Sequence, residues 1–211
     1  METTGVANYR DFSSKYRIFD GSEFYSSKSQ EEPRISAKDV CITFAQFCIT
    51  FLYTVIPNGE GLLALKHFFD QRAVKEPKSE ALLRLAELVL TLNCFSFGDN
   101  FFKQTNGVAM GTKMGPSYAN LFVGFVEHQF FSQYNGPKPQ LYGRYIDDCI
   151  GATSSTREEL TEFITADNSF HPALKYTWEI SDDSLSFLDI KVSIEGNGLC
   201  TSVYYKPTRL T

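Results

Sequence analysis

The apolar run Val40–Ile56 is the feature that most constrains the fold of this chain. It only just reaches the length of about 17 residues that a membrane-spanning helix needs at the least. Gln46 and several threonines interrupt the run, and its β-branched and aromatic residues favour a buried β-strand over a membrane helix. Pro57-Asn58-Gly59 follows as a turn signal. The run therefore predicts a central strand and no membrane segment.

Length and composition indicate a folded globular protein. The chain has 211 residues, which suits one domain or one domain with a tail, and 43% of them are hydrophobic, with 19 Phe and 11 Tyr. The net charge of −5 differs from the basic balance of proteins that grip nucleic acid through its phosphates. If this chain binds nucleic acid, either its own acidic site biases the total or the basic contacts lie on segments that it lacks.

The five cysteines do not form a zinc motif, because no Cys-x-x-Cys pair and no histidine at ligand spacing accompanies them. Residues Met1–Gly5 show no signal peptide. An odd number of cysteines without a secretory signal fits reduced thiols. We therefore expect an intracellular protein, cytoplasmic or nuclear.

The order of predicted elements is that of an α+β fold. The polar, turn-rich residues 1–36 are expected to form a disordered or loosely attached leader, and residues 37–211 a single domain. Periodicity, capping and turn signals predict helices at 61–69, 79–92, 117–133 and 155–166, a hairpin at 95–102, and strands at 175–180, 186–194 and 200–205. The helix at 155–166 is expected to open with a capping box between Ser155 and Glu158.

Two adjacent carboxylates stand out in the segment Gly143–Ile150. Asp147 and Asp148 are expected at the tip of a tight hairpin between short apolar strands. Exposed turns use aspartate routinely, so a solvated turn is one interpretation. The other is a metal site, since Mg²⁺ and Mn²⁺ prefer carboxylate oxygens.

Five ordered blocks resemble the palm of a reverse transcriptase, and most closely the Penelope-like retroelement class. They are Leu52-Tyr53-Thr54-Val55-Ile56-Pro57, then Gln104-Thr105-Asn106-Gly107-Val108-Ala109-Met110-Gly111 with the following Pro116 and Ala119-Asn120, then Arg144-Tyr145-Ile146-Asp147-Asp148, Phe187-Leu188-Asp189 and Lys206-Pro207-Thr208. The resemblance covers about residues 47 to 208. It implies a polymerase-type palm, an antiparallel sheet packed against helices, with incomplete fingers and thumb.

The resemblance also implies a reaction and its participants. The family carries out RNA-directed DNA synthesis, adding deoxynucleotides by two-metal chemistry. The expected partners are an RNA template, a DNA primer and deoxynucleoside triphosphates, and the expected cofactor is Mg²⁺ or Mn²⁺. By resemblance, Asp147 and Asp148 are the catalytic metal ligands.

Other block residues are expected near the substrate by resemblance. Gln104, Gly107, Met110 and Gly111 lie in the segment that the family places against the incoming nucleotide and the templating base; the glycines permit close backbone approach. The alternative is a loop leading into the next helix. Tyr53 stands where the family has an aromatic that abuts the sugar, and a core tyrosine is the alternative. Phe187-Leu188-Asp189 and Lys206-Pro207-Thr208 resemble the strands beneath the primer terminus, or are plain sheet residues.

Cys48 is the departure from the family pattern that matters most. The family places its first catalytic aspartate five residues before the Tyr53 position, and a soft sulfur replaces hard oxygen poorly. Asp39 lies nine residues earlier, some 30 Å away along an extended strand. We therefore expect Cys48 beside Asp147 and Asp148, weak metal binding, and impaired activity. Two hypotheses stay open: a reverse transcriptase domain, or a non-catalytic palm remnant that binds nucleic acid or a protein.

Overall fold

The computed structural model describes residues 18–19, 42–196 and 198–205, which divide into two compact units. Phe51–Tyr134 and His171–Leu174 form what we call the helical unit. The other described residues form the sheet unit. Each unit is described by itself.

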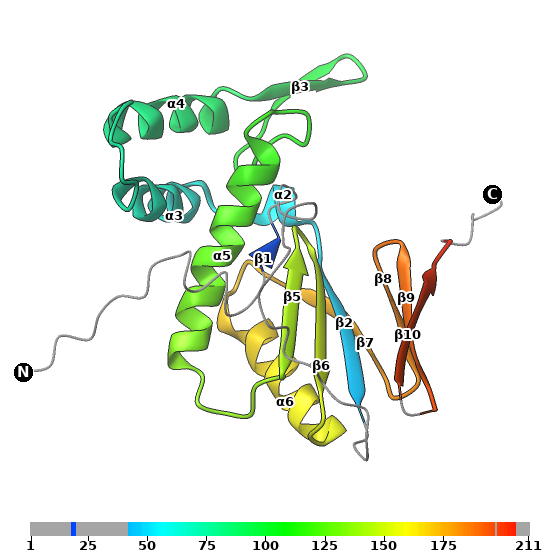
Figure 1. Ribbon diagram of the computed structural model, residues 1–211. Helices are drawn as coiled ribbons and strands as arrows, with labels where there is room; N and C mark the ends of the chain where they lie inside the picture. Colours follow the sequence, from blue (N-terminus) through cyan, green and yellow to red (C-terminus); the bar gives the residue numbers. More distant parts are fainter. Residues whose placement is uncertain (1–17, 20–41, 197, 206–211) are drawn as a thin grey trace, which may run out of the picture. The chain divides into compact units, whose positions relative to one another are not determined.

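The sheet unit is built on a five-stranded sheet in the order β1-β5-β6-β2-β7 (Figure 1). The strands are β1 (Ile18–Phe19), β2 (Thr43–Ile49), β5 (Leu141–Tyr145), β6 (Asp148–Thr153) and β7 (Tyr176–Ser181). β2 pairs antiparallel with both β6 and β7, so it is an internal strand, as its apolar sequence predicted. The strand is shorter than the apolar run, because Leu52–Val55 forms the short helix α2 instead.

Helix α6 (Arg157–Phe170) covers one face of this sheet. Phe47 of β2 is almost fully buried there, with its ring centroid 5.8 Å from that of Tyr142 and 5.8 Å from that of Tyr176. Tyr142 in turn contacts Phe163 of α6. Aromatic rings at these separations add to the stability gained by burying their area.

The capping box of α6 lies one residue later than predicted. Thr156 and Glu159 form it: the Glu159 amide donates to Thr156 Oγ1 at 3.2 Å, and the Thr156 amide donates to Glu159 Oε2 at 3.3 Å. The predicted pair Ser155 and Glu158 is therefore wrong. Both pairs have the same spacing, and the sequence pattern alone does not separate them.

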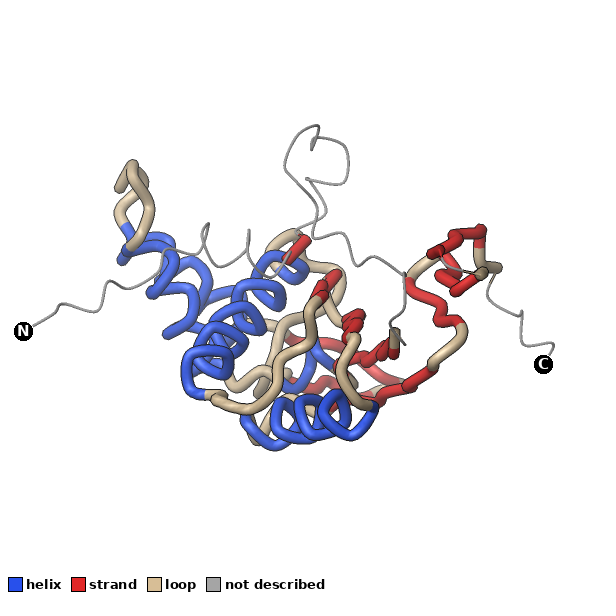
Figure 2. The backbone as a smooth tube through the Cα atoms, turned by 60° about the horizontal axis from the view of Figure 1, so that its bottom comes forward, coloured by secondary structure: helices blue, strands red, loops and turns tan. Residues whose placement is uncertain are grey.

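A second, three-stranded sheet completes the sheet unit. Its strands are β8 (Ser184–Phe187), β9 (Ile190–Glu195) and β10 (Gly198–Val203), in the order β10-β9-β8 with antiparallel pairing. Figure 2 draws the strands of both sheets as red segments of the backbone tube. The two sheets share a core in which Leu185 packs with Ile42, Phe44 and Ala152. The single strand predicted at 186–194 is wrong, because a turn at Leu188–Asp189 divides it into β8 and β9.

The helical unit consists of α2, three longer helices and one hairpin. The helices are α3 (Asn58–Asp70), α4 (Ser79–Thr91) and α5 (Gly115–Gln133), and the hairpin pairs β3 (Cys94–Phe97) with β4 (Asn100–Lys103). α3 begins at Asn58, three residues before the predicted start. Tyr118 and Phe122 of α5 are buried, and Phe125 contacts His67 of α3 with ring centroids 5.1 Å apart.

The fold class is therefore α+β, as predicted, with helices and largely antiparallel sheets. Among the described residues, no helix is both long and apolar enough to cross a bilayer. Most of the predicted leader, together with Asp39 and Lys206-Pro207-Thr208, lies outside the described residues. Ile18–Phe19, within the predicted leader, pairs in parallel with Arg144–Tyr145 as strand β1. The predicted division at residue 36 stays a prediction.

Candidate active site

The two adjacent aspartates lie at the tip of the β5–β6 hairpin, in the sheet unit. Ile146 and Asp147 form the two-residue turn, and Asp148 begins β6. Ile146 has a φ of 55°, in the left-handed region that β-branched residues rarely adopt. The backbone amide of Ile49 donates to the carbonyl of Asp147 at 2.9 Å, which ties the turn to β2.

Cys48 lies beside both aspartates. It is the register partner of Asp148 in the β2–β6 pairing, so the two side chains point to the same face of the sheet. Its sulfur lies 4.0 Å from Asp147 Oδ2 and 3.8 Å from Ile49 O, either of which can accept the single thiol hydrogen. All three side chains are half-buried. This is the neighbourhood that the sequence predicted for Cys48.

These donors do not fit a pair of magnesium ions. The site offers two carboxylates and one thiol, whereas Mg²⁺ takes oxygen ligands in octahedral geometry. Within the described ranges, no group of three or more His, Cys, Asp or Glu side chains has the arrangement of a metal site. The side chains present can attract a divalent cation, but they lack the hard oxygens that would clamp two.

Asp148 also lines a polar cavity of about 530 Å³ within the sheet unit. Its lining residues come from β2, β6, β7, the β8–β9 hairpin and the segment after β10: Gln46, Asp148, Glu179, Ser184, Leu185, Ser186, Leu188, Lys191 and Tyr204. Leu188, with a φ of 55°, is the first residue of the β8–β9 turn. In the Phe187-Leu188-Asp189 block, Phe187 therefore ends strand β8, while Leu188 and Asp189 form a turn where the sequence suggested a strand, and Leu188 borders the same cavity as Asp148.

Tyr53 and Gly107 come together in the helical unit. The amide of Gly107 donates to Ile56 O and that of Val108 to Tyr53 O, each at 2.7 Å. Gly107 has a φ of +71°, and a Cβ atom there would lie 2.1 Å from Tyr53 O. Gly107 is therefore needed for close packing of this loop on α2, whether or not a nucleotide binds.

The other three predicted substrate residues have different surroundings. Gln104 accepts a hydrogen bond from Asn93 Nδ2 at 2.6 Å and donates one to Asn106 O at 2.8 Å, so its side chain fastens the loop. Met110 is 71% exposed. A Cβ at Gly111 would meet no atom within 4 Å. Met110 and Gly111 are thus the open part of the segment, while Gln104 and Gly107 serve the loop itself.

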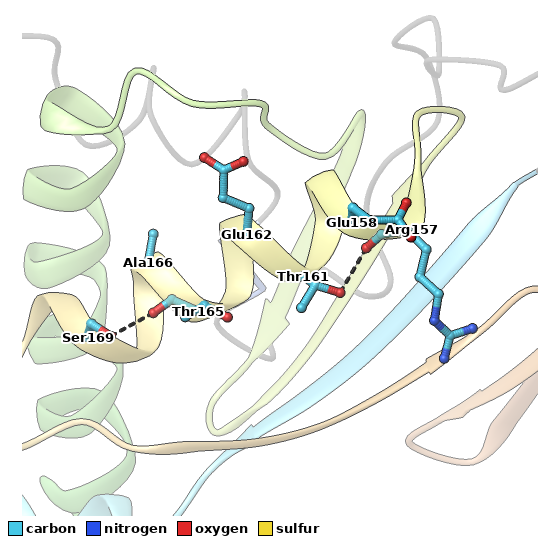
Figure 3. Close-up of a pocket in the computed structure, with 7 residues that line it drawn as sticks. All are labelled: Arg157, Glu158, Thr161, Glu162, Thr165, Ala166 and Ser169. Carbon is cyan, nitrogen blue, oxygen red and sulfur yellow. Dashed lines mark hydrogen bonds between the residues drawn. The ribbon is translucent and has the colours of Figure 1, made fainter.

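A larger depression of about 630 Å³ lies along α6 in the sheet unit (Figure 3). Two of its hydroxyls are already used within the helix: Thr161 donates to Arg157 O and Ser169 to Thr165 O, each at 2.8 Å. The Arg157 guanidinium bonds Asp182 at 3.1 Å. These features describe a solvated helix face, so we do not assign a site there.

Arg144 is a site residue that sequence reasoning missed. It is fully buried, and its Nη1 donates to the carbonyl of Ile146 at 2.9 Å, directly before Asp147. The signal was present in the alternation of β5, where Tyr142 and Arg144 point to one face. A charged side chain on the buried face of a strand is rare and usually makes a specific polar interaction.

An internal strand beside a two-aspartate hairpin, in an antiparallel sheet covered by a helix, defines the class of fold: a polymerase palm. Comparison with solved structures gives the same class. Telomerase from Candida albicans, in complex with a TWJ fragment of telomeric RNA, superposes with a TM-score of 0.59 at 10% identity, over 75% of this chain and 30% of that one. Telomerase from Candida tropicalis, truncated from its C-terminal domain, gives a TM-score of 0.56 at 10% identity, over 76% and 35%.

The RNA-dependent RNA polymerase of BmCPV, at its elongation state, gives a TM-score of 0.54 at 12% identity, over 74% of this chain and 16% of that one. No family model matches the sequence, and a search of curated proteins finds no significant match. The chain spans about a third of the telomerase chains. At these identities the likeness shows the fold, a polymerase-like domain, and nothing finer.

Proposed function

We propose that this chain is a reverse transcriptase palm of the Penelope-like type whose polymerase activity is impaired. The ordered blocks and the palm fold support the family, and with it an RNA template, a DNA primer and deoxynucleoside triphosphates as partners. In this proposal Asp147 and Asp148 are the remaining catalytic carboxylates. Tyr53, Gln104, Gly107, Met110 and Gly111 belong to the nucleotide-binding side.

The observation that carries the impairment is the position of Cys48. Its sulfur lies 4.0 Å from Asp147 Oδ2 and opposite Asp148 in register, where the family pattern calls for a third carboxylate. In an active palm, Asp147, Asp148 and a third carboxylate would hold the divalent cations, which would stabilise negative charge in phosphoryl transfer. A thiol at this position supplies no hard ligand, so Mg²⁺ or Mn²⁺ should bind no more tightly than roughly millimolar.

Primer extension with manganese tests the proposal. Four proteins are compared on an RNA template with a DNA primer: the natural chain, Cys48→Asp, Cys48→Asn, and Cys48→Asp joined to the fingers and thumb of an active family member. Cys48→Asn is the matched control, since it has nearly the size of aspartate without the charge. Positioning of substrates accounts for about 7–11 kcal/mol of such barriers, so activity is expected first in the joined protein. Extension by the natural chain that disappears in Asp147→Ala would refute the impairment.

The donor set also favours a second candidate function, a non-catalytic palm that binds nucleic acid or a protein. Fluorescence anisotropy with an RNA–DNA hybrid tests the first of these. If the hybrid lies along the palm, Asp147 and Asp148 without a bound cation repel its phosphates, so Asp147→Asn with Asp148→Asn should tighten binding. Binding that is absent in both proteins would favour a protein partner over nucleic acid.

A further inference from the structure

The turn that carries the two aspartates is held in an unfavourable backbone conformation. Ile146 has a φ of 55°. A β-branched residue in the left-handed region is strained by an amount of order 1–3 kcal/mol, and such a residue persists only where its surroundings enforce the conformation. Left to itself, the Ile146–Asp147 turn would move to another conformation, and the directions of both aspartates would change with it.

Within the described part of the chain, each carbonyl of this turn accepts one hydrogen bond. The amide of Ile49 donates to Asp147 O at 2.9 Å, and Arg144 Nη1 donates to Ile146 O at 2.9 Å. The first bond is an ordinary extension of the β2–β6 pairing. The second comes from a side chain and fixes the peptide plane between Ile146 and Asp147.

Packing alone does not explain an arginine at this position. Arg144 is 0% exposed and is the register partner of Cys149, which is also fully buried, while Tyr142 lies two residues earlier on the same face. Burying a guanidinium costs free energy that an apolar side chain of similar size would avoid. A long donor is needed, however, to reach around the strand end and bond the carbonyl of the turn.

The β8–β9 hairpin has a turn of the same kind. Leu188 has the same φ of 55°, an aspartate follows it, and the amide of Tyr204 donates to Asp189 O at 2.8 Å. In both turns, the carbonyl of the second residue thus accepts a hydrogen bond from a backbone amide. The hydrogen bond from the Arg144 side chain to Ile146 O is the contact that we relate to the positions of Asp147 and Asp148.

We propose that Arg144 is a positioning residue: it holds Ile146 in the left-handed conformation and thereby fixes the directions of Asp147 and Asp148. We call the effect of Arg144 on the conformation of the turn its mechanical role, and the effect on catalysis that would follow its catalytic meaning. The catalytic meaning rests on the proposed function, whereas the mechanical role does not. Its consequence is that a substitution at Arg144 disturbs the two aspartates without touching them.

Amide hydrogen exchange followed by NMR tests the mechanical role on the natural chain. The Ile49 amide reports on the turn. The Ile194 amide, which donates to Asp183 O at 2.9 Å elsewhere in the sheet unit, reports on the unit as a whole. Arg144→Lys keeps the buried positive charge but loses the planar fork of donors. We expect exchange at Ile49 to accelerate about tenfold, the effect of losing one hydrogen bond of ordinary strength, with Ile194 within about twofold.

Ile146→Asn provides the matched variant, because asparagine tolerates the left-handed region without help. In that background Arg144→Lys should accelerate exchange at Ile49 by no more than about twofold, since the conformation then needs less support. Equal acceleration at Ile49 and Ile194 would show that Arg144 supports the whole unit. An unchanged Ile49, or the same tenfold effect in the Ile146→Asn background, would also overturn the proposal.

A kinetic arm tests the catalytic meaning in the joined Cys48→Asp protein. Arg144→Lys should lower kcat while the KM for deoxynucleoside triphosphate stays within about twofold, because the substrate contacts are retained. If the joined protein shows no extension at all, the proposed function fails, and the exchange experiment still decides the mechanical role. Exchange that follows the expectation together with an unchanged kcat would refute the catalytic meaning alone.

Discussion

Replacing Gly107 by alanine should destabilise the helical unit severely, although the change adds only one methyl group. The new Cβ would lie 2.1 Å from Tyr53 O, 2.7 Å from Thr54 Cα and 2.9 Å from Thr54 C, all backbone atoms that have no rotamer to change. The loop must therefore withdraw from α2. That movement threatens the hydrogen bonds from the Gly107 and Val108 amides, each 2.7 Å long.

The cost has three parts. A non-glycine residue at a φ of +71° costs roughly 1–2 kcal/mol, overpacking against a fixed neighbour about 1–3 kcal/mol, and each weakened hydrogen bond about 1 kcal/mol. Relaxation that relieves the clash also breaks the hydrogen bonds, so the three costs do not simply add. We expect Gly107→Ala to lower the free energy of unfolding by about 3–5 kcal/mol. That is a large share of the roughly 5–15 kcal/mol by which a domain is stable.

Gly111→Ala is the matched control within the same segment, because a Cβ there meets nothing within 4 Å. Urea unfolding followed by far-UV circular dichroism measures both variants against the natural chain. We expect Gly111→Ala to stay within about 0.5 kcal/mol, the usual range for surface changes. A Gly107→Ala loss below about 1 kcal/mol, or one equal to that of Gly111→Ala, would refute the packing argument.

Three further predictions concern single features of the helical unit. Tyr118→Phe should raise stability by about 1 kcal/mol in thermal unfolding, because the buried Tyr118 hydroxyl has no hydrogen-bond partner among the described residues and burial raises its pKa; a loss of stability would show that the hydroxyl is satisfied. The pKa of His67 is lowered, mainly by burial and also by the neighbouring His128. Below about pH 6.5 the unfolded chain therefore binds a proton at His67 more readily than the folded chain does, and stability falls as pH falls. His67→Gln should reduce the drop in urea midpoint between pH 7.5 and 5.5, and an equal drop in the variant would contradict this. Phe97 and Phe101 of the β3–β4 hairpin are 78% and 87% exposed, so Phe97→Ser with Phe101→Ser should leave the Tm within about 2 °C while reducing self-association in sedimentation; a Tm drop well beyond that would mean that the two rings are buried in solution.

Strong local patterns predicted most of the fold. The helix predicted at 79–92 was found at Ser79–Thr91, and the hairpin around Gly98 has its turn where glycine and aspartate placed it. Besides the shifted starts of α3 and α6, two errors fall where the backbone departs from ordinary turn chemistry. The Leu188–Asp189 turn contains no glycine, proline or asparagine, and Asp189 alone is too weak a turn signal to separate it from a strand. Leu52–Val55 has strand-like residues but forms α2, because β2 ends at Ile49 and Phe51, with a φ of 55°, is the N-cap of α2.

The candidate site was predicted less evenly, and for a different reason. Block resemblance located the two aspartates, and counting from Tyr53 placed Cys48 beside them, because strand pairing converts sequence spacing directly into position. Arg144 was missed because its role is to bond the carbonyl of the turn. That contact depends on the φ of Ile146, which no residue pattern reveals.

The structure also changes what the blocks mean. Gly107 allows the loop to pack on α2, and the Gln104 side chain fastens that loop to Asn93, so both residues are required by the fold as it stands. A palm that had lost its chemistry would still need them. Position 48 is different, because the Cys48 thiol lies beside the aspartates, 4.0 Å from Asp147 Oδ2. Under the proposed function, the identity of residue 48 therefore bears more directly on metal binding than that of Gln104 or Gly107, whose contacts serve the loop itself.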